Sequence, residues 1–276
     1  MKQLLLFVGL LAGAATVQAQ PKIGVVSYSF RHAFERNIDS TLDAVKAMGI
    51  TDIEFSNLFG QTAAALKAKL DSRGMTCSSY GVGYADLVNK TDEVGLTARV
   101  LGDQFVRVAW IPQDSTGFTE QVLRKAADDF NRAGKLLQEK YQLRFCYHNH
   151  GYEFTARENG TSFDLLVSLT DPRYVGFEMD ILWVFFPGQD PVALLHKYPK
   201  RFFLMHLKDL KKGVAGNTTG GTPGNNNVPL GQGQLDIPAI LKAARKTNVQ
   251  HFYIEDESDR SFQQVPQSLE FVKGMK

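Results

Sequence analysis

The sequence predicts a single-domain α/β protein built as a closed barrel of eight parallel strands, each followed by a helix. Apolar runs of strand length alternate with stretches whose apolar residues recur at helical spacing. Eight such strand–helix pairs in about 250 residues match the size of a (β/α)8 barrel. An open doubly wound sheet is the alternative, and it is less favoured because no glycine-rich phosphate motif follows the first strand.

The individual elements follow from these two periodicities. Strands are expected at residues 22–30, 52–56, 76–84, 105–110, 144–154, 175–185, 202–210 and 251–258. Helices are expected at residues 37–49, 62–74, 94–102, 119–140, 162–170, 190–198, 236–248 and 263–275. Several of these helical patterns stop at glycine, which is a common signal at a helix C-terminus. Because no repeat or linker divides the chain, one domain over residues 20–276 is expected.

The first nineteen residues form a predicted secretory signal peptide. Lys2 precedes an apolar run that is too short for a membrane span, and small residues ending at Ala19 offer a cleavage site. The mature chain is therefore expected in the periplasm. Cys77 and Cys146 lie in apolar runs far apart in the sequence, which favours buried free thiols over a disulfide.

The composition gives few hints about macromolecular partners. The net charge of +2 on 276 residues gives no reason to expect nucleic acid or an anionic membrane as a partner. A homo-oligomer is left open.

Polar residues gather at the ends of the last four predicted strands. A barrel of this kind carries its chemistry at the C-terminal ends of its strands. In each of the four strands two polar residues stand two positions apart and therefore share a face. These pairs are His148 and His150, Glu178 and Asp180, His206 and Lys208, and Glu255 and Glu257.

One residue from each pair is expected to bind a single divalent metal ion. Without a cation, so many ionisable groups packed together would be costly, because burial and like charges disfavour ionisation. The expected ligands are His148, Asp180, His206 and Glu255. This mixed nitrogen and oxygen set carries two negative charges and suits Mn²⁺ first, with Co, Zn, Fe or Mg as alternatives.

Other residues are expected to contact the substrate. His150 would lie over the metal, or would support a ligand through Glu178 or Glu153. Lys208 would stabilise developing negative charge, or would form a salt bridge with Asp209 or Glu257. The expected substrate-binding residues are Glu54, Tyr84, Trp110, Glu153 and Trp183.

A long polar segment, residues 211–233, follows the seventh strand. Loops of this length are uncommon within a domain and are often functional. We expect a lid over the substrate, and a surface insertion is the alternative.

Five motifs resemble the sugar phosphate isomerase/epimerase family of the xylose isomerase-like barrel superfamily. They are YHNHGYEF, FEMDILWV, GQDPVALLHKYPKRFFLMHLKD, PLGQGQLD and YIEDE, and the resemblance covers essentially the whole mature chain. It implies a metal-dependent barrel that acts on sugars or polyols. Asp180, His206 and Glu255 match the family's Asp, His and Glu ligands. His148 stands where the epimerases usually carry Glu, and Trp183 where many relatives carry His.

The first functional hypothesis is a divalent-metal-dependent isomerase or epimerase of a non-phosphorylated sugar or keto-sugar, acting through an enediolate. Glu255 is the first candidate for the base, with His148 or His150 on the other side of the carbon. The second hypothesis is a lyase that eliminates the β substituent of a 3-keto-glycoside. The third is a sugar-binding barrel without catalysis. A DNA-repair endonuclease fits poorly, because it would need several metals and a basic surface.

Overall fold

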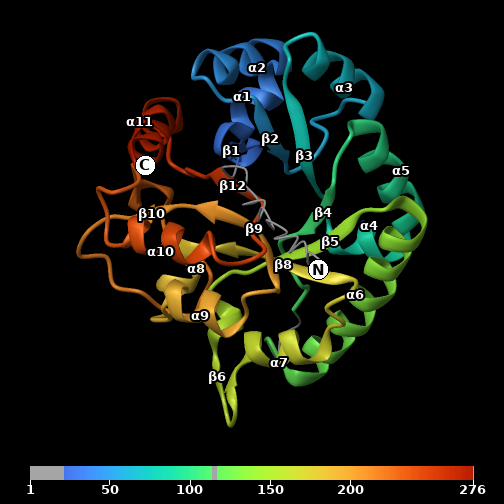
Figure 1. The fold of residues 1–276 in the computed structure, drawn as a ribbon, viewed down its shortest axis with the longest axis vertical. Helices are drawn as coiled ribbons and strands as arrows, with labels where there is room; N and C mark the ends of the chain where they lie inside the picture. Colours follow the sequence, from blue (N-terminus) through green and yellow to red (C-terminus); the bar gives the residue numbers. More distant parts are fainter. Residues whose placement is uncertain (1–21, 114–116, 276) are drawn as a thin grey trace, which may run out of the picture.

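The structure is a computed structural model that describes residues 22–113 and 117–275 (Figure 1). The predicted signal peptide, residues 1–19, lies outside the described residues. Within the described residues, none of the helices combines the length and the apolar character that crossing a bilayer requires.

Eight parallel strands close into a barrel, which confirms the predicted fold class (Figure 1). Around the barrel the strands follow the order β1-β12-β9-β8-β5-β4-β3-β2. All eight predicted strands are present, and each begins where the sequence pattern placed it. Their bounds are β1 Lys22–Val26, β2 Asp52–Phe55, β3 Thr76–Gly81, β4 Phe105–Val108, β5 Arg144–His148, β8 Val175–Asp180, β9 Phe202–Leu207 and β12 His251–Ile254.

Helices cover the outside of the barrel. Polar side chains define several of their first turns: Thr119, for example, accepts a hydrogen bond from the Val122 amide at the start of the longest helix. The helices are α1 Arg31–Arg36, α2 Ile38–Ala47, α3 Ala63–Asp71, α4 Tyr84–Asn89, α5 Thr91–Leu101, α6 Glu120–Tyr141, α7 Ser162–Leu169, α8 Ile181–Phe185, α9 Pro191–Lys197, α10 Ile237–Ala244 and α11 Ser261–Gly274.

Apolar side chains fill the lower part of the barrel interior. Phe105, Cys146, Phe203, Leu204 and Tyr253 form a separate buried cluster there. A larger apolar layer lies between the strands and the helices. Cys77 and Cys146 are buried and free, as predicted. Because apolar groups occupy the interior below, the polar side chains gather at the strand ends above them.

Several strands end earlier than their apolar runs suggested. The run 175–185 splits at Asp180, whose side chain accepts a hydrogen bond from the Trp183 amide and so begins α8. Trp183 therefore lies on a helix, and Tyr84 begins α4 instead of ending β3. A short apolar run fits a strand and a buried helix turn equally well, so periodicity alone could not place these boundaries.

The segment after β9 folds back onto its own start. β10 Asp209–Leu210 pairs antiparallel with β11 Asn227–Val228. The buried Asp209 carboxylate accepts hydrogen bonds from the amides of Leu210, Gly231, Gly233 and Leu235. These four contacts fix both ends of the long loop, and its middle reaches the mouth of the barrel.

Candidate functional site

A cavity of about 470 Å³ opens at the C-terminal end of the barrel. Its floor is polar and includes His148, His206, Lys208 and Glu255, each at most 8% exposed. Its upper walls are rich in aromatic side chains, and residues 220–222 of the long loop complete the lining. The cavity therefore joins a buried charged floor to an open aromatic mouth.

Three neighbouring strands bring Asp180, His206 and Glu255 together. Asp180 is the register partner of His206 on the adjacent strand, and Glu255 follows the end of β12 directly. One ligand atom from each of the three residues lies within 4.8 Å of the others. His206 Nδ1 is 2.9 Å from Glu255 Oε2.

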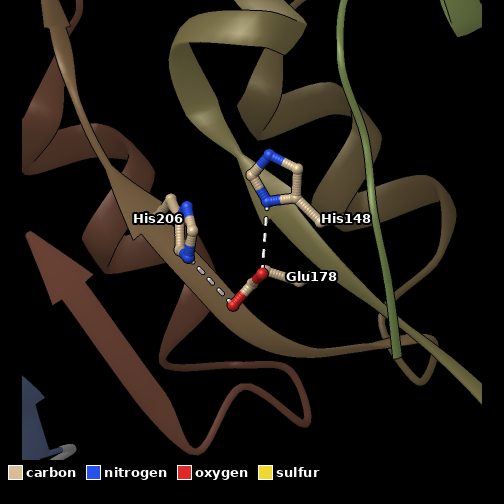
Figure 2. Close-up of side chains that lie close together, drawn as sticks. All are labelled: His148, Glu178 and His206. Carbon is tan, nitrogen blue, oxygen red and sulfur yellow. Dashed lines mark hydrogen bonds and ion pairs between the residues drawn. The ribbon is translucent and has the colours of Figure 1, made fainter. Parts of the chain in front are cut away.

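A second group shares His206 and adds His148 and Glu178 (Figure 2). The Glu178 carboxylate lies between the two rings, with Oε2 3.2 Å from His148 Nδ1 and Oε1 3.2 Å from His206 Nε2. His148 Nε2 is 4.0 Å from Asp180 Oδ2. Three of the expected ligands, Asp180, His206 and Glu255, thus form one group, and the fourth, His148, joins His206 in a second group that also contains Glu178.

The donor atoms of this site fit a divalent metal ion. Asp180 is fully buried, and its Oδ2 has no hydrogen-bond partner among the described residues. Burial raises the pKa of Asp180 to about 6. A buried carboxylate oxygen that accepts no hydrogen bond, beside an imidazole and a second carboxylate, offers the mixed donors that Mn²⁺, Zn²⁺ and related ions bind. Asp180, His206 and Glu255 would hold such an ion.

His206 and Lys208 carry positive charge on the cavity floor. Burial opposes the charged form of His206, but Glu178, Glu255 and Glu54 outweigh it and raise its pKa well above the ordinary value. Burial would raise the pKa of Glu255, but the charges of Lys208 and His206 lower it strongly. Glu255 is therefore firmly ionised, and a bound metal would replace protons on the floor.

Lys208 is buried among carboxylates. Its Nζ is 3.1 Å from Glu255 Oε2 and 3.6 Å from Asp180 Oδ2, and it also forms an ion pair with Glu257. The expected alternative of a salt bridge to Glu257 is thus present. Asp209 takes no part in it, because its oxygens accept backbone amides. Burial would lower the pKa of Lys208, but these carboxylates raise it well above the usual range.

Glu54 and Arg107 pair beside His206, and Arg107 also lines the cavity. Glu54 Oε1 accepts hydrogen bonds from Arg107, with a shortest distance of 2.7 Å, and from His206 Nε2 at 2.9 Å. Burial would raise the pKa of Glu54, but Arg107 and His206 lower it to about 2. The fully buried Glu54 was expected to contact substrate; the structure instead places it beside His206.

His150 lies in an aromatic surround. Its ring stacks on Tyr152 at 5.7 Å between centroids and contacts Trp110 at 5.8 Å and Trp183 at 5.9 Å. Its Nδ1 has no hydrogen-bond partner among the described residues. Burial, followed by the charge of Lys208, lowers the pKa of His150 to about 3. The imidazole is therefore neutral at pH 7 and lines the cavity.

The remaining expected substrate contacts divide into two groups. Tyr84, Trp110 and Trp183 line the cavity. Glu153 does not: it is fully buried, and it accepts hydrogen bonds from Tyr147 Oη at 2.5 Å and from the His150 amide at 3.0 Å. Its position explains how the turn after β5 holds His150 over the floor.

Sequence reasoning missed two charged residues of this site. Arg107 pairs with both Glu54 and Glu178, and its signal in the sequence is a charge inside the apolar strand FVRV. Glu178 was considered only as a partner of His150, but it contacts His148 and His206 instead. Both roles depend on which strands are neighbours in the barrel.

The chain belongs to the xylose isomerase-like TIM barrel family, and the sequence model of that family matches residues 42–275. This confirms the expected resemblance at the level of the family.

Among known proteins, an inosose dehydratase of Geobacillus kaustophilus is 28% identical over 197 residues, which are 64% of this chain and 63% of that protein. The chain thus spans somewhat less than two thirds of this relative's length. A sugar phosphate isomerase/epimerase from Parabacteroides distasonis has the same fold, with a TM-score of 0.74 at 24% identity over 94% of this chain and 98% of that chain. The IOLI protein, solved with a zinc atom, has a TM-score of 0.69 at 13% identity over 92% of this chain and 96% of that chain.

Proposed function

We propose that this protein is a divalent-metal-dependent lyase that eliminates the β substituent of a keto-sugar, with a 3-keto-glycoside as the substrate class. One observation carries the proposal. A neutral proton acceptor, His150, and a cationic donor, Lys208, line the same cavity as His206 and Glu255. Elimination needs these two kinds of group, one at the carbon that loses a proton and one at the oxygen that departs.

Asp180, His206 and Glu255 would hold the metal ion, with His148 as a fourth ligand. The ion would polarise the carbonyl oxygen and so make the neighbouring C–H proton easier to remove. Glu178 and Glu54 lie at Nε2 of His206, whereas Nδ1 faces Glu255. Carboxylates behind a ligating histidine commonly fix its tautomer and ring orientation in this way.

The proton acceptor is His150 in this proposal. Glu255 was the first candidate for this role, but Lys208 and His206 hold it as a firmly ionised carboxylate of low pKa. Its Oε2 already pairs with His206 and Lys208, so this carboxylate suits a metal ligand, whereas His150 Nδ1 has no hydrogen-bond partner among the described residues and is free to accept a proton. Two-base epimerisation across the sugar carbon would need Glu255 as one of its bases, so the geometry favours elimination.

The proposed elimination needs no oxidant or reductant. In a 3-keto-glycoside, His150 takes the proton from C2, and the electron pair of that C–H bond forms the C1=C2 double bond. The C1–O bond to the aglycone breaks, and its electrons stay on the departing oxygen. Lys208 stabilises the charge that develops on this oxygen, and the imidazolium of His150 returns its proton to complete the alcohol.

The similarity to a protein named inosose dehydratase supports elimination, because a dehydratase removes water across two carbons. An isomerase or epimerase of a non-phosphorylated sugar is the second candidate. It shares the first step, and His150 could return its proton to a neighbouring carbon instead of an oxygen.

Export to the periplasm belongs to the same proposal. Sugar phosphates are mainly cytosolic, so an exported enzyme would meet unmodified sugars and glycosides. Recovery of a mature chain that begins at Gln20 from the periplasmic fraction would support it, and an uncleaved cytosolic chain would contradict it.

The test follows two products in deuterated water. Metal-loaded protein is incubated with a 3-keto-glycoside, and the proposal predicts release of the aglycone together with an unsaturated keto-sugar. Solvent deuterium at one carbon without release would indicate an isomerase or epimerase. Saturable binding with neither exchange nor release would indicate a sugar-binding barrel.

A further inference from the structure

Two aromatic side chains stand open at the mouth of the cavity. Trp110 is 50% exposed and Tyr28 is 41% exposed, whereas the charged floor is almost fully buried. Trp110 follows β4, and Tyr28 lies in the short helical turn after β1, three strands away in the barrel order. Both line the same cavity as the floor. Large apolar rings exposed at a cavity mouth commonly mark a binding surface.

Neighbouring side chains hold both rings in place. Trp110 packs against Tyr152, with ring centroids 5.0 Å apart and a nearly perpendicular arrangement. The Arg31 guanidinium lies 4.4 Å from the centroid of the Tyr28 ring and donates hydrogen bonds to the carbonyls of Tyr28 and Glu257. Rings that are already fixed lose little conformational entropy when a ligand stacks on them, which favours binding.

The cavity is larger than one sugar ring requires. A hexose has twelve heavy atoms, and at the ~30 Å³ that liquid water gives each molecule these would fill at most about 360 Å³. The cavity holds about 470 Å³. Besides the aromatic rings, Ser56, Asn57 and Thr222 add polar groups to the lining of this larger space.

We infer that Trp110 and Tyr28 form an outer subsite for a second ring joined to the keto-sugar, so that the natural substrate is a glycoside and not a free sugar. This inference rests on the proposed function, since it places the keto-sugar on the floor. The shared chemistry of the ligand is a ring with an apolar face, which an aryl aglycone and a second sugar both have. Trp110 is then a residue that determines specificity.

The experiment compares a ring-bearing glycoside with a ringless one. Affinities of phenyl glucoside, cellobiose and methyl glucoside for metal-loaded protein are measured by calorimetry, which needs no turnover. The wild-type protein is expected to bind the ring-bearing ligands about tenfold more tightly than methyl glucoside. Trp110→Ala should remove this preference, and Trp110→Phe should keep part of it. Phe262→Ala, which changes an aromatic side chain of similar exposure (42%) outside the cavity, is the matched control.

The outcomes separate this inference from the proposed function. A preference for phenyl glucoside alone identifies an aryl aglycone as the source of the ring, and a preference for cellobiose identifies a second sugar. Equal or absent binding of all three ligands, or a preference that survives Trp110→Ala, contradicts the subsite. Aglycone release from keto-glycosides is scored separately, so the subsite can stand where elimination fails, and elimination can stand without the subsite.

Discussion

Glu178 is the residue on which the orientation of the site depends most directly. Its two oxygens contact His148 Nδ1 and His206 Nε2, each at 3.2 Å, so one carboxylate faces a ring nitrogen of both histidines (Figure 2). Glu178→Gln would turn an N–H₂ group toward one of these nitrogens and disturb that ring. We predict that metal affinity falls about 10- to 100-fold.

Competition with a coloured chelator measures this affinity. The exposed Glu158→Gln in the β6–β7 hairpin, Ala156–Arg157 and Gly160–Thr161, controls for the loss of one negative charge. Equal affinity in wild type and Glu178→Gln would show that Glu178 does not orient the ligands.

Glu153 should make stability depend on pH. Burial raises its pKa from 4.5 to about 7, so between these values the folded chain holds a proton that the unfolded chain releases. This contribution is fully present below pH 4.5 and is lost as the pH rises through 7. Its size is roughly 3 kcal/mol, at about 1.4 kcal/mol for each pKa unit.

Glu153→Gln removes this titration while keeping an oxygen that accepts the Tyr147 hydrogen bond. Urea unfolding at pH 5, 6, 7 and 8 should therefore show a smaller loss of the free energy of unfolding in the variant than in wild type. Parallel pH profiles would mean that Glu153 is already ionised in the folded chain.

At the scale of elements, the long loop after β9 is expected to act as a lid over the cavity. Residues 220–222 line the cavity, and Gly220 packs close to His150 and Tyr152. Deletion of residues 217–221 should lower kcat/KM about tenfold or more by exposing the reacting groups to water. Metal content should stay at the wild-type level, because the ligands come from strand ends.

A loop change elsewhere provides the control for this deletion. The β6–β7 hairpin extends away from the barrel (Figure 1), and glycine at Glu158 and Asn159 alters it without touching the cavity. Unaltered kinetics in the deletion variant would show that the loop is a surface insertion.

The sequence predicted the elements well because each leaves a local signal. The alternation of strand and helix periods found every barrel strand, and the strand ends pointed to Asp180, His206 and Glu255. The boundaries inside continuous apolar runs escaped prediction, as Trp183 shows, because a buried helical turn and a strand have the same composition. Only the hydrogen bond from the Trp183 amide to Asp180 decides where the strand stops.

At the scale of the whole molecule, barrel closure determines which charges meet. Glu54, Arg107 and His206 come from β2, β4 and β9, and no local pattern connects them. Whether a strand-end carboxylate faces the cavity or pairs with a buried cation depends on strand order and register. For this reason Glu54 was expected at the substrate, whereas closure places it beside His206.

The barrel also explains why the polar groups can be buried at all. Carboxylates of Glu54, Glu178, Asp180 and Glu255 pair with Arg107, Lys208 and His206 within one continuous network. Removing one member would leave an uncompensated buried charge, which is strongly destabilising. A divalent ion can therefore bind at this site by replacing the protons that now provide part of the positive charge.

The most direct test is the metal content of the purified protein after incubation with Mn²⁺ or Zn²⁺ and removal of the free ion. We predict about one bound ion for each wild-type chain, strong loss in Asp180→Ala, His206→Ala and Glu255→Ala, and retention in Glu158→Ala. Circular dichroism confirms that each sample is folded. A folded wild-type protein that binds no divalent ion, or ligand variants that keep it fully, would contradict the account.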